Sequence, residues 1–137
     1  MRTMGLDLGE KTIGVAVSDL LGLTAQGLKV IKRQGQDELE ELAQIIKDYE
    51  VSTIVIGLPK NMNNTLGPRA IISQEFAEVL KKRFPDLKIV LQDERLTTAE
   101  IQRQLISADI SRNKRKKVVD KMAAMLILQT YLDKNKM

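Results

Sequence analysis

The sequence contains no histidine and no cysteine among its 137 residues. A Ser-His triad, a thiolate nucleophile, a disulfide and a zinc site with nitrogen or sulfur ligands are therefore excluded. There is no tryptophan, and only two tyrosines and two phenylalanines are present, so base stacking should contribute little to any nucleic-acid recognition. Carboxylates around a hard cation remain the leading chemistry. Mg²⁺ and Mn²⁺ prefer oxygen ligands, and two such ions can promote hydrolysis of a phosphodiester.

Long apolar runs are also missing. No run approaches the roughly 20 residues that span a bilayer, and residues 1–3 lead straight into a predicted strand rather than a signal peptide. We therefore expect a cytoplasmic protein that does not associate with membranes. The composition, 43% hydrophobic and 29% charged, suits a folded protein. The length fits one domain over residues 1–137.

Positive charge is concentrated in one short segment. The net charge is +4, and five positive charges come from Arg112, Lys114, Arg115, Lys116 and Lys117. We expect these residues to form a basic loop just before Asp120. The loop is either a solvated surface feature or a patch that follows a phosphate backbone. Its closeness to a candidate catalytic acid favours the second interpretation.

Hydrophobic periodicity predicts an α/β protein. The predicted strands are residues 3–9, 13–17, 25–32, 51–56 and 88–92. The first predicted helix begins at residue 37, and the three that follow span residues 69–84, 97–107 and 118–132. A hairpin meander is thus followed by βαβ units, which implies a mixed five-stranded sheet flanked by helices.

Local signals predict where several of these elements begin, end and bury a face. Asp37 and Glu40 are spaced as a capping box, Thr97 or Thr98 caps the third helix, and Gly57-Leu58-Pro59 should end the fourth strand. The predicted apolar stripes are Leu39, Leu42, Ala43 and Ile46 in the first helix, and Ile72, Phe76, Val79 and Leu80 in the second.

Asp7 belongs to the sequence Asp7-Leu8-Gly9 at the end of the first predicted strand. The glycine would let backbone, metal or phosphate approach closely. Ligand sites in sheets of this kind gather where strands end, which makes Asp7 a candidate ligand. The alternative is an acid that ends an ordinary hairpin strand. Asp19 is expected to form a turn or to support a ligand rather than to be one.

A second acidic position follows the fifth predicted strand, at Asp93-Glu94-Arg95. Adjacent residues of a strand point to opposite faces, so only one of the two acids can reach a given metal. The pattern by itself does not choose between them. Arg95 either neutralises one of the acids or grips a phosphate through two hydrogen bonds.

Asp120 is the third candidate. It lies near the start of the last predicted helix, where the helix macrodipole already favours an anion and supplies a complete structural explanation. Ala123 and Ala124 would allow that helix to pack closely on the sheet, which would bring Asp120 toward the strand ends. Met122 and Met125 are expected to fill the core.

The polar loop of residues 60–68 offers amide and hydroxyl groups suited either to turns or to contacts with phosphate and base edges. Gly67 and Pro68 then begin a helix, whose N-terminus favours anions. Together with the basic run, the candidate nucleic-acid contacts are Lys11, Lys60, Arg69 and Arg95.

These motifs jointly resemble those of the YqgF/RuvX family, which consists of RNase H-like proteins described as Holliday junction resolvases and as pre-16S rRNA nucleases. The resemblance covers residues 5–124 in the family's order. Its motifs are Gly5-x-Asp7-x-Gly9, Ile13-Gly14-Val15-Ala16-x-Ser18-Asp19, Gly57-Leu58-Pro59, Gly67-Pro68-Arg69, Asp93-Glu94-Arg95-Leu96-Thr97-Thr98 and Asp120-x-x-Ala123-Ala124.

The resemblance implies an RNase H-like fold in which Asp7, Glu94 and Asp120 are both the catalytic and the metal-binding acids. It therefore favours Glu94 over Asp93. Two positions depart from the family pattern. Asn64 stands where glycine is frequent, and Thr12 stands where an arginine is common, which puts one basic substrate contact in doubt.

The leading hypothesis is a nuclease dependent on Mg²⁺ or Mn²⁺ that matures the 5′ end of pre-16S rRNA. Cleavage of branched DNA at Holliday junctions is the alternative within the same class. A noncatalytic RNA-binding factor is an alternative outside the nuclease class. An ATPase or sugar-kinase relative is a further class, because Asp7-Leu8-Gly9 also resembles the phosphate loop of the actin-like fold, but such proteins need two such domains. The oligomeric state is left open, a homodimer included.

Overall fold

The computed structural model describes residues 2–9, 11–33, 37–59, 67–94 and 112–135, with residues 59, 93, 94 and 112–120 described by their backbone alone. Its elements follow the chain in this order: β1 (Arg2–Leu8), β2 (Thr12–Ser18), β3 (Ala25–Lys32), α1 (Glu38–Asp48), β4 (Val51–Pro59), α2 (Pro68–Arg83), β5 (Lys88–Glu94) and α4 (Arg112–Lys134). Among the described helices, none has the length and apolarity needed to cross a membrane.

The strands form one mixed sheet in the order β3-β2-β1-β4-β5. The β1-β2 and β2-β3 pairs are antiparallel, whereas β4 pairs in parallel with both β1 and β5. The predicted five-stranded mixed sheet is therefore confirmed. Because β1, β4 and β5 run in the same direction, their carboxyl ends meet at one edge of the sheet.

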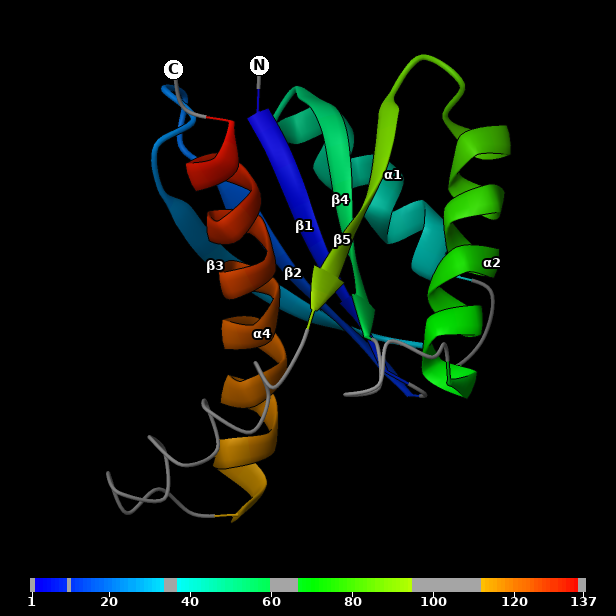
Figure 1. Cartoon of the computed structure of the whole chain (residues 1–137), viewed down its shortest axis with the longest axis vertical. Helices are drawn as coiled ribbons and strands as arrows, with labels where there is room; N and C mark the ends of the chain where they lie inside the picture. The colour runs from blue at the N-terminus through cyan, green and yellow to red at the C-terminus, as the bar shows by residue number, and fades with distance from the viewer. Residues whose placement is uncertain (1, 10, 34–36, 60–66, 95–111, 136–137) are drawn as a thin grey trace.

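The two faces of the sheet carry different layers (Figure 1). Helix α4 covers one face across β1, β2 and β3, while α1 and α2 cover the other. The larger core lies on the side of α1 and α2, where Met4, Leu6, Ile54 and Ile56 are fully buried. The side of α4 has a smaller cluster around Ala16, Ala124 and Leu128.

Helix α4 approaches the sheet closely because both surfaces carry small residues. Ala123 and Ala124 are fully buried, as the sequence predicted. A Cβ atom added to Gly5 would lie 2.7 Å from Leu128 Cβ and 3.0 Å from the Ala124 carbonyl oxygen. At Gly27, an added Cβ would lie 3.0 Å from Met125 Sδ. Gly5 in β1 is therefore what admits this helix, while Gly27 in β3 leaves room for the Met125 side chain.

Two predicted boundaries were wrong. The fourth strand does not end at Gly57 but continues to Pro59, because residues 57–59 pair in parallel with residues 92–94 of β5. The β1-β4 pairs run only as far as Leu6 and Ile56, so Pro59 pairs with β5 alone, as at a sheet edge, where proline is tolerated. The basic run is not a loop, since α4 already begins at Arg112. Lys and Arg are good helix formers, and residues 112–117 include no glycine or proline.

Three further local predictions have different outcomes. Asp37 is the N-cap of α1 but makes no side-chain cap hydrogen bond, because its backbone is already helical (φ −91°, ψ −6°) rather than extended. Val79 is 43% exposed, since α2 turns Ala70, Ser73 and Ala77 toward the core. The helix predicted at 97–107 lies outside the described residues.

Candidate functional site

Asp7 is the buried acid of β1, with 8% of its surface exposed. Strand alternation gives it the same face as Gly5, which is the face that α4 covers. Its antiparallel neighbour on β2 is Gly14. On the other side, the β1-β4 register pairs Leu6 with Ile56, so the next position along β4 beside Asp7 is Gly57. The carboxylate therefore stands between two glycines.

The end of β5 brings the second acidic position to the same side of the sheet. Gln92 pairs with Gly57, and position 94 pairs with Pro59 at the end of both strands. By alternation, positions 92 and 94 belong to the face of α4, whereas position 93 belongs to the face of α1 and α2. Backbone register thus gives position 94, and not position 93, the face of α4, a choice that the local pattern left open.

Helix α4 runs antiparallel to β1, and this direction determines where the backbone of Asp120 lies along the strand. The Gln129 side chain accepts a hydrogen bond from the Ala25 N–H at 2.9 Å, and further along β3, Gly27 lies against Met125 and Lys121. Residue numbers in α4 therefore fall as β1 proceeds toward Asp7 (Figure 1).

The same contacts show how far along the direction of β1 the backbone of Asp120 lies. Gly5 lies against Ala124 and Leu128. From Gly5 to Asp7 the strand rises about 6.7 Å, which corresponds to roughly four to five residues of helix. Asp120 is one helical turn before Ala124 on the same helix face, so its backbone comes level with Asp7.

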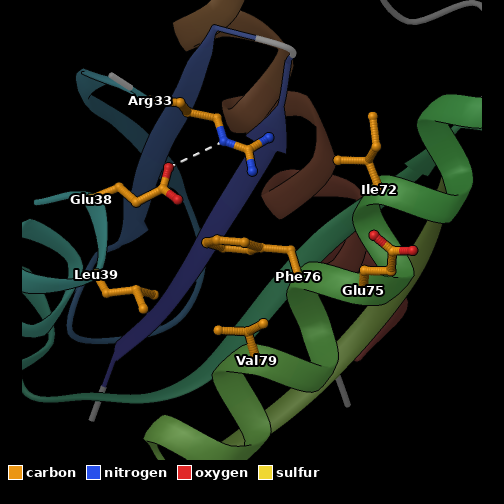
Figure 2. Close-up of a pocket in the computed structure, with 7 residues that line it drawn as sticks. All are labelled: Arg33, Glu38, Leu39, Ile72, Glu75, Phe76 and Val79. Carbon is orange, nitrogen blue, oxygen red and sulfur yellow. Dashed lines mark hydrogen bonds and ion pairs between the residues drawn. The ribbon is translucent and has the colours of Figure 1, made fainter. Parts of the chain in front are cut away.

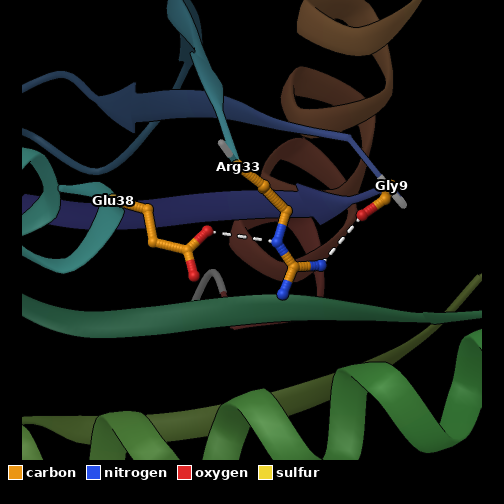
Figure 3. A network of polar contacts seen from close by, with 3 residues as sticks. All are labelled: Gly9, Arg33 and Glu38. Atoms are coloured by element: carbon orange, nitrogen blue, oxygen red, sulfur yellow. Dashed lines mark hydrogen bonds and ion pairs between the residues drawn. The ribbon is translucent and has the colours of Figure 1, made fainter. Parts of the chain in front are cut away.

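Two arginines hold the backbone that follows Asp7. Arg69, in the first turn of α2, donates through Nη2 to the Leu8 carbonyl oxygen at 3.1 Å. Arg33, just after β3, donates through Nη1 to the Gly9 carbonyl oxygen at 2.9 Å. Arg33 also pairs through Nε with Glu38 Oε2 at 3.1 Å (Figure 3). The tip of β1 is thereby tied to segments 24 and 61 residues away in the chain.

Sequence reasoning missed the role of Arg33. It had placed Arg69 among the nucleic-acid contacts, and the structure adds that this side chain binds the Leu8 carbonyl. The signal for Arg33 was weak, because a basic residue after a strand is usual on a protein surface. Its role comes from a contact with Gly9, which is 24 residues away in the chain, and the residues next to Arg33 in the sequence do not predict that contact.

A cavity of about 600 Å³ lies between α1 and α2. Figure 2 shows Arg33, Phe76 and the side chains around them. The guanidinium carbon of Arg33 lies 5.5 Å from the centroid of the Phe76 ring. The described residues that line it are Arg33, Glu38, Leu39, Ile72, Glu75, Phe76 and Val79. This cavity is on the face opposite α4, and Asp7 is not among the described residues that line it.

The remaining predicted contacts are only partly described. Lys11 is exposed next to the β1-β2 turn. Lys60 and Arg95 lie outside the described residues, and residues 112–117 form the first turns of α4. Among the described side chains, no group of three or more acids could hold a metal ion, and the side chains of Glu94 and Asp120 are outside that described set.

Asp19 is a turn former, as expected. Its Oδ1 accepts hydrogen bonds from the N–H groups of Leu23 at 2.8 Å and Thr24 at 3.3 Å. The Leu23 N–H is the main cause that lowers the pKa of this carboxyl below its ordinary value. The carboxylate thus stabilises the β2-β3 turn and lies at the opposite end of β2 from Gly14.

Comparison with known proteins places the chain among relatives. A family model described as "RuvX: Holliday junction resolvase" matches residues 1–134. The chain belongs to the RuvX family. A RuvX relative from Desulfitobacterium hafniense is 62% identical over 133 residues, which is 97% of this chain and 92% of the relative. One from Geobacillus kaustophilus is 60% identical over 136 residues, with 97% and 98% covered. Both are named "Putative pre-16S rRNA nuclease".

Solved structures that resemble this RuvX chain show the same fold. Thermus thermophilus RuvC, in complex with a Holliday junction substrate, has a TM-score of 0.55 at 12% identity, with 99% of this chain and 97% of that chain covered. The fowlpox virus Holliday junction resolvase has a TM-score of 0.53 at 16% identity, with 98% and 99% covered. The predicted RNase H-like α/β fold is confirmed.

Proposed function

We propose that this RuvX chain is a divalent-cation-dependent nuclease that cleaves phosphodiester bonds in structured RNA, with pre-16S rRNA as its cytoplasmic substrate. The observation that carries the proposal is the convergence of three acidic positions. Asp7 is buried on the face of α4, position 94 ends β5 on that face, and position 120 lies level with Asp7. The names of relatives at 62% and 60% identity support RNA as the substrate.

The residues present suit a hard cation. The donor set offers carboxylate oxygens and no nitrogen or sulfur, which matches Mg²⁺ or Mn²⁺. Asp7, Glu94 and Asp120 would hold the ion, beside glycines that leave room at Asp7 for a substrate. When bound, the cation polarises the phosphate and lowers the pKa of water.

The protein's own groups would position the RNA. Arg69 and Arg33 keep the tip of β1 in place, so that the Asp7 carboxylate is presented without reorganisation. The first turns of α4, with Arg112, Lys114, Arg115, Lys116 and Lys117, would attract the phosphate backbone, as would Lys11, Lys60 and Arg95. Recognition would therefore be mainly electrostatic.

The test is Mn²⁺-dependent cleavage of a 16S precursor fragment by the wild type and by Asp7→Asn, Glu94→Gln and Asp120→Asn, with RNA binding measured in parallel. We expect each variant to lose about 100-fold or more in cleavage rate while it retains RNA binding. The matched control is Asp93→Asn, which removes an adjacent charge on the opposite face and should cleave at nearly the wild-type rate. Undiminished cleavage by Asp7→Asn would refute the proposal.

A second candidate is resolution of four-way DNA junctions, which the description of the family model favours. The same carboxylate chemistry can cut DNA. A four-way DNA junction and the RNA fragment are therefore compared at equal concentration and salt. A higher kcat/KM on the junction would favour the second candidate. Salt-sensitive binding of RNA without cleavage of either polymer would favour a noncatalytic RNA-binding factor.

A further inference from the structure

Gln92 is a buried polar residue that the preceding assignment leaves without a role. Only 7% of its surface is exposed, and its Nε2 has no hydrogen-bond partner in the part of the chain that the structure describes. A buried donor without a partner is unfavourable, and native proteins keep few of them. Each one that persists calls for an explanation, such as a catalytic role or a bound water or ion.

The sheet register places Gln92 across from Asp7. Gln92 pairs with Gly57 on β4, and Gly57 is the β4 position beside Asp7. Strand alternation assigns all three positions to the face of the sheet that α4 covers. Two strand spacings, about 9.6 Å, therefore separate the backbone at Asp7 from that at Gln92. Gly57 is buried and presents no side chain, so no side chain of β4 stands between the positions of Asp7 and Gln92.

The chemistry of these two groups suits a phosphate. Asp7 is an acceptor that attracts a cation, whereas the Gln92 Nε2 is a neutral donor. If a cation were held at Asp7, a phosphate bound to it would bring negative oxygens to this face, and a neutral donor would bind such an oxygen without repelling the cation. A lysine at the same place would bring a competing positive charge.

We propose that the Gln92 side-chain amide donates a hydrogen bond to a nonbridging oxygen of the phosphate that is cleaved, which lies above Gly57. This assignment rests on the proposed nuclease function and adds a substrate-binding residue to it. No bond to Gln92 forms or breaks in the reaction, so its contribution is orientation and stabilisation of negative charge.

The test compares Gln92→Met with the wild type, because methionine keeps the length of the side chain and removes the amide. We expect the cleavage rate at saturating RNA to fall by about 10- to 100-fold, the effect of one hydrogen bond to a charged group. Binding of a fluorescein-labelled hairpin RNA in Ca²⁺ should change by less than about threefold, because other phosphate contacts supply most of the affinity. The melting temperature should stay equal or rise, because an unpaired donor has been removed.

Ser73→Ala is the matched control. Ser73 Oγ is the other buried side-chain atom without a partner among the described residues, but it lies in α2 on the opposite face. Its removal should likewise preserve the melting temperature and leave cleavage unchanged.

The outcomes separate the assignment from the function. A Gln92→Met protein that cleaves at the wild-type rate overturns the assignment while the nuclease function stands. A lower melting temperature, with cleavage and binding reduced in proportion, shows a structural role and also overturns it. A wild type that cleaves no RNA removes the proposed function and the assignment with it.

Discussion

Arg33 illustrates how one side chain can stabilise a site without belonging to its chemistry. It bonds Glu38 and the Gly9 carbonyl oxygen, and its side chain is only 20% exposed. We expect Arg33→Met to lower the free energy of unfolding by about 1–2 kcal/mol, because a partly buried charged donor leaves two acceptors unpaired. Urea denaturation measures this, and cleavage should also slow because the backbone after Asp7 loosens.

The control for Arg33 is Arg83→Met. Arg83 pairs with Glu40 at 3.2 Å, but the two side chains are 45% and 72% exposed. Exposed ion pairs contribute about 0–1 kcal/mol, so this variant should be close to the wild type in stability and in cleavage. Equal losses in the two variants would contradict the role given to Arg33.

Asp19 makes the stability of the β2-β3 turn depend on pH. Its pKa is lower in the folded protein than in the unfolded chain, chiefly because the Leu23 N–H bonds the carboxylate. The stabilisation is therefore complete above the unfolded pKa, about 3.9, and is lost as pH falls through the lower folded pKa.

The check is a comparison of wild type and Asp19→Asn by urea denaturation at pH 6 and at pH values below about 3.9. At pH 6 the wild type should be the more stable, because only the aspartate is charged. The difference should shrink steadily as the carboxyl is protonated. A difference that does not depend on pH would show that charge at Asp19 contributes nothing.

The close packing of α4 on β1 is the feature of this helix that matters most for the site. In Gly5→Ala, the new methyl group would lie 2.7 Å from Leu128 Cβ and 3.0 Å from a backbone oxygen, so the helix must move. We expect a loss of about 1–3 kcal/mol, measured by urea denaturation. Cleavage should fall further than stability alone explains, because Asp120 is carried away from Asp7.

Gly27→Ala is the comparison for this change. There the new methyl group would meet Met125 Sδ at 3.0 Å, and the end of a methionine side chain can rotate aside. A smaller loss of stability and nearly normal cleavage are expected. If both variants cleave normally, the spacing between α4 and β1 does not control the site.

The basic helix ends lie at two opposite edges of the sheet. The first turns of α2 and α4 lie at the edge where β1, β4 and β5 end, whereas the last turn of α2 lies at the far edge (Figure 1). The basic run of residues 112–117 is thus on the side of Asp7, while Lys81 and Lys82 are far from it.

The placement of these basic residues at opposite edges predicts the salt dependence of RNA binding. Lys116→Gln with Lys117→Gln should weaken binding and reduce the slope of log K against log salt by about one for each phosphate that the variant no longer neutralises. Lys81→Gln with Lys82→Gln removes the same charge at the far edge and should leave the slope nearly unchanged. Fluorescence anisotropy of labelled hairpin RNA over a salt series measures both. Equal slopes in the two double variants would mean that net charge, not the basic helix start, governs binding.

The sequence alone determined the chemical class of the candidate site and the order of the described elements. The absence of histidine and cysteine left carboxylates, and periodicity predicted the strands and the helices α1, α2 and the body of α4. These are local properties: side chains two, three or four residues apart share a face by backbone geometry. Ala123 and Ala124 even predicted the close approach of α4.

Only the tertiary structure decided how distant residues meet. The parallel pairing of β4 with β5 carried the fourth strand to Pro59, put position 94 rather than position 93 on the face of α4, and set Gln92 beside Gly57. Arg33 acquired its role by reaching the Gly9 carbonyl. Strand register and side-chain reach depend on how the whole chain packs, so segments far apart in the chain fix them and no local pattern encodes them.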